Sequence, residues 1–104
     1  MSNMNELMRQ ASRMQRRIQQ IHEEMKLKTW TAKVVGDKVS ATVTGERKIS
    51  VIDVDAEFFE GEGRDLVLDS IAAAINAAQE MAEKDIEAAV AQATGGLKIP
   101  GITG

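Results

Sequence analysis

The stretch TWTAKVVGDKVSATVTGERKISVIDVD, residues 29–55, decides the fold class of this protein. It contains three runs that are rich in Val, Ile and Thr, and a glycine stands in each break between them. Runs of this composition, separated by tight-turn residues, are typical of β-strands. The predicted strands span residues 29–35, 38–44 and 47–54.

The middle run has the simplest strand pattern. Val39, Ala41 and Val43 alternate with Lys, Ser and Thr, as expected of a strand with one buried face and one wet face. The dipeptides Gly36-Asp37 and Gly45-Glu46 suit the tight turns that join antiparallel neighbours. We therefore expect a three-stranded antiparallel meander.

The last run is apolar on both of its predicted faces. Its spacing predicts that Ile49 and Val51 point to one side. Ile52 and Val54 would then point to the other side. A strand of this kind needs cover on both faces, and a second copy of the chain could supply it.

The residues before the meander have a helical period. Apolar side chains recur there at alternating spacings of three and four over three heptads, which predicts one long amphipathic helix over residues 3–28. The a/d positions are Met4, Leu7, Ala11, Met14, Ile18, Ile21 and Met25.

A second long helix is predicted after the Gly-rich joint EFFEGEG, over residues 64–94. Its expected buried stripe is Leu68, Ile71, Ile75, Ala78, Ala82, Ala89 and Ala93. Thr94-Gly95-Gly96 should end it, because glycine readily adopts the left-handed conformation of a helix C-cap. Residues 1–94 are thus predicted to form a single α+β domain of order α-β-β-β-α, and residues 95–104 a flexible Gly/Pro tail.

The composition limits both the core and the compartment. One Trp, two Phe and no Tyr leave a thin core, which favours burial against a second copy. With no Cys, neither a disulfide nor a catalytic thiolate is available. The start lacks the apolar core of a secretory signal, and no uncharged apolar run is long enough to cross a bilayer. We expect a cytoplasmic protein that has no membrane partner.

The formal net charge of −3 hides an asymmetry between the two ends of the chain. Residues 1–28 contain six Lys/Arg and three Asp/Glu, whereas residues 56–94 contain two Lys/Arg and nine Asp/Glu. Such segregation suggests an electrostatic role for the basic end. Chance segregation of the charges that every helix surface needs is the plain alternative.

No motif predicts catalysis, a cofactor or a small-molecule substrate. Asp53, Asp55 and Glu57 resemble the start of a calcium loop, but Phe58 stands where such a loop needs Gly, so a strand-ending acidic turn fits better. The sequence GEG at residues 61–63 is not followed by G-K-[ST], so it predicts a hinge and no phosphate loop. The single histidine has no second histidine one turn away, so we expect no metal site and no enzyme.

The arginines of the first helix form the most informative pattern. Arg9 and Arg16 take heptad position f and Arg13 takes position c, so all three lie opposite the apolar seam. They extend over ~10 Å of helix, which allows a row of guanidinium groups to contact successive backbone phosphates without reading bases. A purely solubilising helix face explains the same pattern about equally well. The few aromatics argue against recognition of single strands or RNA loops.

Five stretches together resemble the YbaB/EbfC family of nucleoid-associated proteins. They are NELMRQASRMQRRIQQIHEEM at residues 5–25, VSATVTG at 39–45, ISVIDVDAEFF at 49–59, DLVLDSIAAAINAAQEMAEK at 65–84 and GGLKIPGI at 95–102. They cover nearly the whole chain in the family's order. The chain departs from the family pattern at Ala56, where Pro is usual, at Phe58-Phe59, where two leucines are usual, and at Ala77, where Asp often stands.

The resemblance implies a tweezer-like homodimer that binds double-stranded DNA with little sequence preference in the nucleoid. It implies a part in nucleoid organisation, and in gene regulation or DNA repair. The residues expected to contact phosphates are Arg9, Arg13, Arg16 and Arg17, with Lys26, Lys28, Arg47 and Lys48 as weaker candidates. The alternative is a protein–protein interaction module whose Met-rich heptad seam docks a partner helix.

Overall fold

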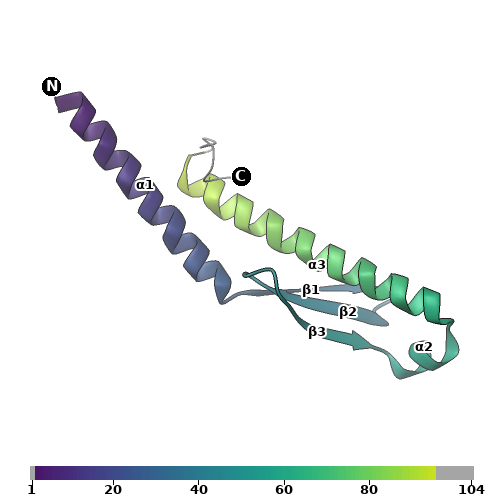
Figure 1. The fold of residues 1–104 in the computed structure, drawn as a ribbon. Helices are drawn as coiled ribbons and strands as arrows, with labels where there is room; N and C mark the ends of the chain where they lie inside the picture. The colour runs from purple at the N-terminus through teal and green to yellow at the C-terminus, as the bar shows by residue number, and fades with distance from the viewer. Residues whose placement is uncertain (1, 96–104) are drawn as a thin grey trace.

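The computed structural model describes residues 2–95 and places six elements in an elongated arrangement. They are α1 (Ser2–Lys26), β1 (Thr29–Val34), β2 (Val39–Thr44), β3 (Ile49–Val54), α2 (Ala56–Gly61) and α3 (Arg64–Ala93). Figure 1 shows α3 lying along one face of the sheet while α1 projects from one end of it. The predicted α+β fold, a three-stranded antiparallel meander flanked by two long helices, is confirmed. The predicted tail, apart from Gly95, lies outside the described residues.

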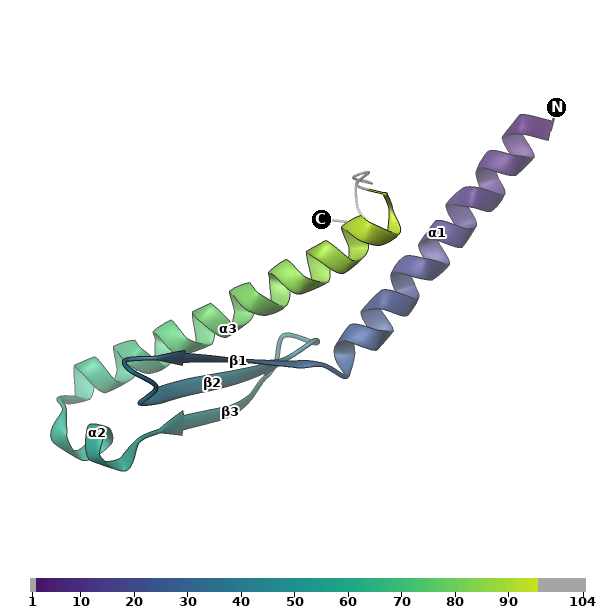
Figure 2. The ribbon, with the colours of Figure 1, turned by 180° about the vertical axis from the view of Figure 1, so that it is seen from behind.

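The sheet has the strand order β1-β2-β3, and both pairings are antiparallel. Trp30 and Ala32 of β1 and the apolar residues of β2 are buried on the face that α3 covers. The indole N–H of Trp30 donates a 2.7 Å hydrogen bond to a carboxylate oxygen of Asp85, which joins β1 to α3. None of the helices α1, α2 and α3 lies over the opposite face, which is in front in Figure 2.

The pairing of β2 with β3 contains a bulge that corrects one prediction. Val43 pairs with Ile49 but Thr42 pairs with Val51, so Ser50 is an extra residue in β3. Directly opposed residues point to the same face of a sheet. Ile49 therefore lies on the side covered by α3 and Val51 on the open side, and the prediction that they share a face is wrong. The bulge shifts the alternation by one residue.

Each strand is shorter than predicted, because residues at the strand ends belong to the turns. Val35, Gly36 and Asp37 all have positive φ, and Lys38 N–H donates to the Val35 carbonyl at 3.1 Å. In the second turn Arg47 takes the positive φ, and its N–H donates to the Thr44 carbonyl at 2.9 Å. Two-residue and bulged hairpin turns need these left-handed conformations.

The glycine in the second turn is required for a different reason. A Cβ on Gly45 would overlap the carbonyl group of Met25, at the end of α1. The Gly45 N–H donates to the Lys28 carbonyl at 3.1 Å. The turn between β2 and β3 therefore packs directly on the end of α1 and fixes where that helix leaves the sheet.

A short helix, α2, occupies a segment for which the sequence predicted only a joint. The carboxylate of Asp55 accepts a 3.1 Å hydrogen bond from Phe58 N–H and so caps this helix. The predicted acidic turn is thus a helix N-cap. Six residues are too few to show a helical period in the sequence.

The packing surface of α3 consists mainly of small residues. Ala74, Ala78 and Ala82 are fully buried, which lets the helix backbone approach the sheet closely. The predicted stripe is correct for Ala78 and Ala82 but wrong for Leu68, which is half exposed while its neighbour Val67 is buried. Gly95 has φ +65°, the left-handed conformation expected after the helix end.

Within residues 2–95, only the second half of α1 packs against the other elements. Ile18, Ile21 and Met25 belong to the same buried cluster as Trp30 and residues of α3. Figures 1 and 2 agree that the first half of α1 extends beyond the end of α3. The apolar seam is thus buried along part of its length and open along the remainder.

Candidate nucleic-acid interface

The packing of α1 determines which side of the helix faces outward. Because Ile18, Ile21 and Met25 are buried, the opposite heptad positions point to solvent. Arg9, Arg13 and Arg16 occupy those positions, and all three are exposed in the structure. The arginine row that the sequence predicts is therefore one continuous outward surface.

Two of the four α1 arginines are involved in ion pairs. Arg9 lies 3.8 Å from Glu6, and Arg17 lies 3.7 Å from Glu24 and donates a long hydrogen bond to Gln20. The four charged side chains of these pairs are half exposed or more, so the pairs contribute little and can rearrange easily.

Arg13 and Arg16 carry the least compensated charge on this surface. Within residues 2–95, neither guanidinium has a carboxylate at ion-pair distance. They are neighbours in the row, about one helical turn apart. The part of the arginine row formed by Arg13 and Arg16 is therefore its most electropositive part, available to an anion.

The four weaker candidates lie in different surroundings. Lys26 pairs with Glu23 at 3.1 Å, whereas Lys28 and Lys48 are exposed and form no ion pair within the described range. All of them lie near the junction of α1 with the sheet.

Arg47 is held by α3. Its Nε donates to the Gln79 side chain at 2.6 Å, and the Gln79 amide donates back to the Arg47 carbonyl at 3.0 Å. A terminal nitrogen of Arg47 lies 3.8 Å from Glu83. Among the predicted phosphate contacts, Arg47 is the one whose recorded bonds reach another element, and these bonds attach the β2–β3 turn to α3. Residues so distant in sequence give no local signal of this contact.

The charge of α3 is opposite to that of α1. Its exposed carboxylates include Glu80, Glu83, Asp85 and Glu87, and Lys84 is the cation among them. A polyanion is repelled by this helix and attracted by the arginine row. The charge asymmetry of the sequence thus corresponds to two separate helices.

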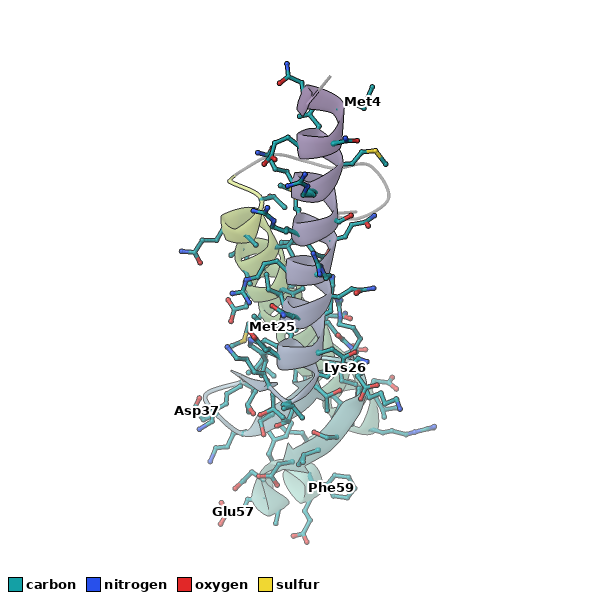
Figure 3. All side chains as sticks on the ribbon, turned by 90° about the vertical axis from the view of Figure 1, so that its left-hand side faces the viewer. Met4, Met25, Lys26, Asp37, Glu57 and Phe59 are labelled. Carbon is teal, nitrogen blue, oxygen red and sulfur yellow. The ribbon has the colours of Figure 1, made fainter. Side chains whose placement is uncertain are left out.

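The structure also has an apolar surface that the sequence predicted only in part. Ile49, Val51 and Ile52 of the edge strand β3 are about half exposed, and Phe59 of α2 is more exposed still. Figure 3 shows Phe59 pointing outward from α2. The sequence indicated that β3 needs cover, but the exposure of Phe59 follows from α2, which was not predicted. We call these four residues the β3 surface.

Other kinds of site find no support in the part of the chain that the structure describes. Residues 2–95 contain no group of three side chains placed to ligate a metal ion. His22 is exposed on α1. None of the helices in this range combines the length and the apolar character needed to cross a bilayer.

Comparison with known proteins shows the family to which the chain is similar. The model of the YbaB/EbfC DNA-binding family matches residues 1–97. A nucleoid-associated protein of Clostridium acetobutylicum is 36% identical over 100 residues, which cover 96% of this chain and 89% of the relative. A nucleoid-associated protein of Rickettsia rickettsii is 29% identical over 100 residues, with coverage of 96% and 94%.

Among solved structures, an uncharacterized protein of Helicobacter pylori has the same fold, with a TM-score of 0.61. Its sequence is 20% identical, and the match covers 72% of this chain and 87% of that one. Together, the fold, the basic helix and the family match define a nucleoid-associated type of DNA-binding protein. The chain belongs to the YbaB/EbfC DNA-binding family, which confirms the resemblance noted in the sequence.

Proposed function

We propose that this protein is a non-enzymatic homodimer that binds double-stranded DNA through phosphate contacts from α1, with little sequence preference. It acts in the nucleoid, where it contributes to DNA organisation and, through that, to gene regulation or DNA repair. The membership of a DNA-binding family supports the ligand class. The exposed arginine row supports binding through phosphate contacts.

The observation that carries this proposal is the uncompensated charge of Arg13 and Arg16 in the arginine row. The row from Arg9 to Arg16 extends over ~10 Å, and a duplex carries roughly six phosphate charges over that length. Guanidinium groups bind phosphate oxygens well, and such contacts hold a duplex without reading its sequence.

The β3 surface supports the homodimer. β3 is an edge strand, so one row of its backbone N–H and C=O groups has no strand partner within residues 2–95, and its apolar side chains are only half covered. Antiparallel pairing of β3 with β3 of a second copy would satisfy these groups and bury Ile49, Ile52 and Phe59. The tweezer-like arrangement of the projecting helices stays a prediction.

The alternative, a module that docks a partner helix along the whole heptad seam, has less support. Ile18, Ile21 and Met25 are already buried within the chain, so they are not available to a partner. Among the described residues, only the first half of the seam remains open.

The proposal is tested by replacing Arg9, Arg13 and Arg16 with Gln. We expect affinity for several unrelated duplexes to fall by a similar factor, because phosphate contacts are independent of sequence. The unfolding midpoint should hardly change, because all three side chains are exposed. Gel shift and thermal unfolding measure the two effects.

The matched control replaces Lys33, Arg64 and Lys84 with Gln. This variant loses the same net charge from exposed positions away from α1. We expect it to retain most of the affinity. Equal losses in the two variants, or a loss confined to particular duplexes, would contradict phosphate contact by the arginine row.

A further inference from the structure

The end of α1 that is farthest from the sheet carries an apolar surface, and no other part of residues 2–95 covers it. Met4, Leu7 and Met8 are 67%, 62% and 64% exposed, and Ala11 is exposed beside them. Spacings of three and four residues place these side chains on one face of the helix. We call these four residues the distal seam.

The distal seam continues an interface that is already formed. Its heptad positions lead without a break into Ile18, which is buried in one cluster with Val90 near the end of α3. Met14 and Ala93 pack at the edge of the same cluster. Figure 3 shows α3 behind the lower part of α1 and ending well short of Met4. The seam is open because α3 ends before α1 does.

The charges around the distal seam permit a second copy of the same surface. The positions that flank it are Asn3 and Gln10 on one side and Asn5 and Ser12 on the other, and none is charged. Arg9 and Arg13 lie on the opposite face. Two distal seams can therefore meet without bringing like charges together, and the arginine rows stay outside the contact.

We propose that the distal seam packs antiparallel against the distal seam of a second copy and so joins one homodimer to the next. Leucine and methionine side chains suit this contact, because the flexible thioethers adapt to a symmetric partner. We assign the partner as a second copy of this chain for two reasons. The distal seam and its flanks are uncharged, so two copies can meet without repulsion, and the seam continues the contact between α1 and α3.

The contact joins different dimers if the homodimer of the proposed function pairs β3 with β3. Antiparallel β3 strands point the two chains in opposite directions. The chain is 72 Å long and the distal seam lies at one end of it. The two seams of one dimer then lie far apart, and each is free to meet a seam of another dimer. Two self-interfaces in one chain lead to closed tetramers or to open chains.

The contact should be weak in solution and more effective on DNA. Each copy buries only four side chains, fewer than a stable interface of standard size needs. Dimers held on one duplex meet at a high effective concentration, which favours weak contacts between neighbours. Cooperative binding to long DNA is the expected consequence.

The test is sedimentation velocity of the full chain without DNA, over a concentration series in high salt. We expect the wild-type mass to rise above that of a dimer, and Leu7→Gln to keep the dimer mass. Gln favours helix about as well as Leu, so the helix is preserved. The matched control is Leu27→Gln, since Leu27 is also exposed but lies outside the distal seam; it should behave as the wild type does.

A second variant tests proximity directly. The chain has no cysteine, so Met8→Cys places one thiol close to the centre of the proposed antiparallel contact. Mild oxidation should cross-link two copies, because a disulfide needs Cα atoms within ~7 Å. Leu27→Cys should cross-link far less.

The outcomes separate this inference from the proposed function. A wild-type mass that stays at the dimer, with no Met8→Cys cross-link, overturns the inference and leaves the homodimer intact. A monomer that pairs only through the distal seam, and loses that pairing in Leu7→Gln, supports the inference and refutes pairing through β3. An equal mass increase in wild type and Leu7→Gln also overturns the inference.

Discussion

The two halves of α1 have the same heptad pattern but different surroundings. Ile18 and Ile21 are 3% exposed, whereas Met4 and Leu7 are more than 60% exposed. Both pairs occupy a/d positions, and their sequences predict the same helix face. The difference arises from α3, which, in the part of the chain that the structure describes, packs beside the second half only. A heptad thus identifies a helix and its apolar side, while the length of the neighbouring helix decides which part is buried.

The two halves of α1 therefore have different roles. The second half of α1 attaches it to the sheet and to α3. The first half carries Arg9 and Arg13 on one face and the distal seam on the other. We interpret the first half as an arm built for contacts with DNA and with other copies.

The largest expected effect comes from Ile21→Ala, compared with Leu7→Ala. Truncating buried Ile21 should lower the free energy of unfolding by about 2–5 kcal/mol, because it loses buried apolar area and leaves a cavity. Leu7→Ala should change it by less than about 0.5 kcal/mol, because the side chain is exposed. Urea unfolding of both variants at a concentration where only the dimer is present measures the difference. Similar losses would mean that the distal seam is covered within that dimer.

A smaller effect is expected at the junction that positions the helix. In Gly45→Ala the new Cβ would overlap the Met25 carbonyl, so α1 and the turn must separate. We expect a loss of about 1–3 kcal/mol, the usual range for overpacking. Gly61→Ala is the control, because nothing lies within 4 Å of its Cβ and its φ is not positive. If Gly45→Ala unfolds as the wild type does, the close contact at this junction is not essential.

Most of the fold could be predicted because its signals are local. The alternation in β2 and the heptads of α1 each repeat several times within one element, and burial follows the repeats in β2 and in the second half of α1. The bulge at Ser50 could not be predicted, because it depends on how the β2–β3 turn closes. In α3, alanines occur on several faces, so the apolar pattern did not distinguish Val67 from Leu68.

The candidate site also has some features that could be predicted from the sequence and others that could not. The outward direction of Arg9, Arg13 and Arg16 follows from heptad spacing, since all three lie opposite the seam. The contacts of Arg47 with Gln79 and Glu83 could not be predicted, because they join a turn to a helix distant in sequence. The open distal seam also depends on a tertiary fact, the position where α3 ends.

The most direct test of the account is the salt dependence of affinity for a random duplex. If a dimer neutralises roughly eight phosphates, log affinity should fall with log salt at a slope of about −7. The eight contacts are those of Arg9, Arg13, Arg16 and Arg17 in each of the two copies. The variant with Arg9, Arg13 and Arg16 replaced by Gln keeps Arg17 in each copy, so it should retain roughly two contacts and a slope of about −2. A wild-type affinity that does not respond to salt, or the same slope in both proteins, would contradict DNA binding by the arginine row.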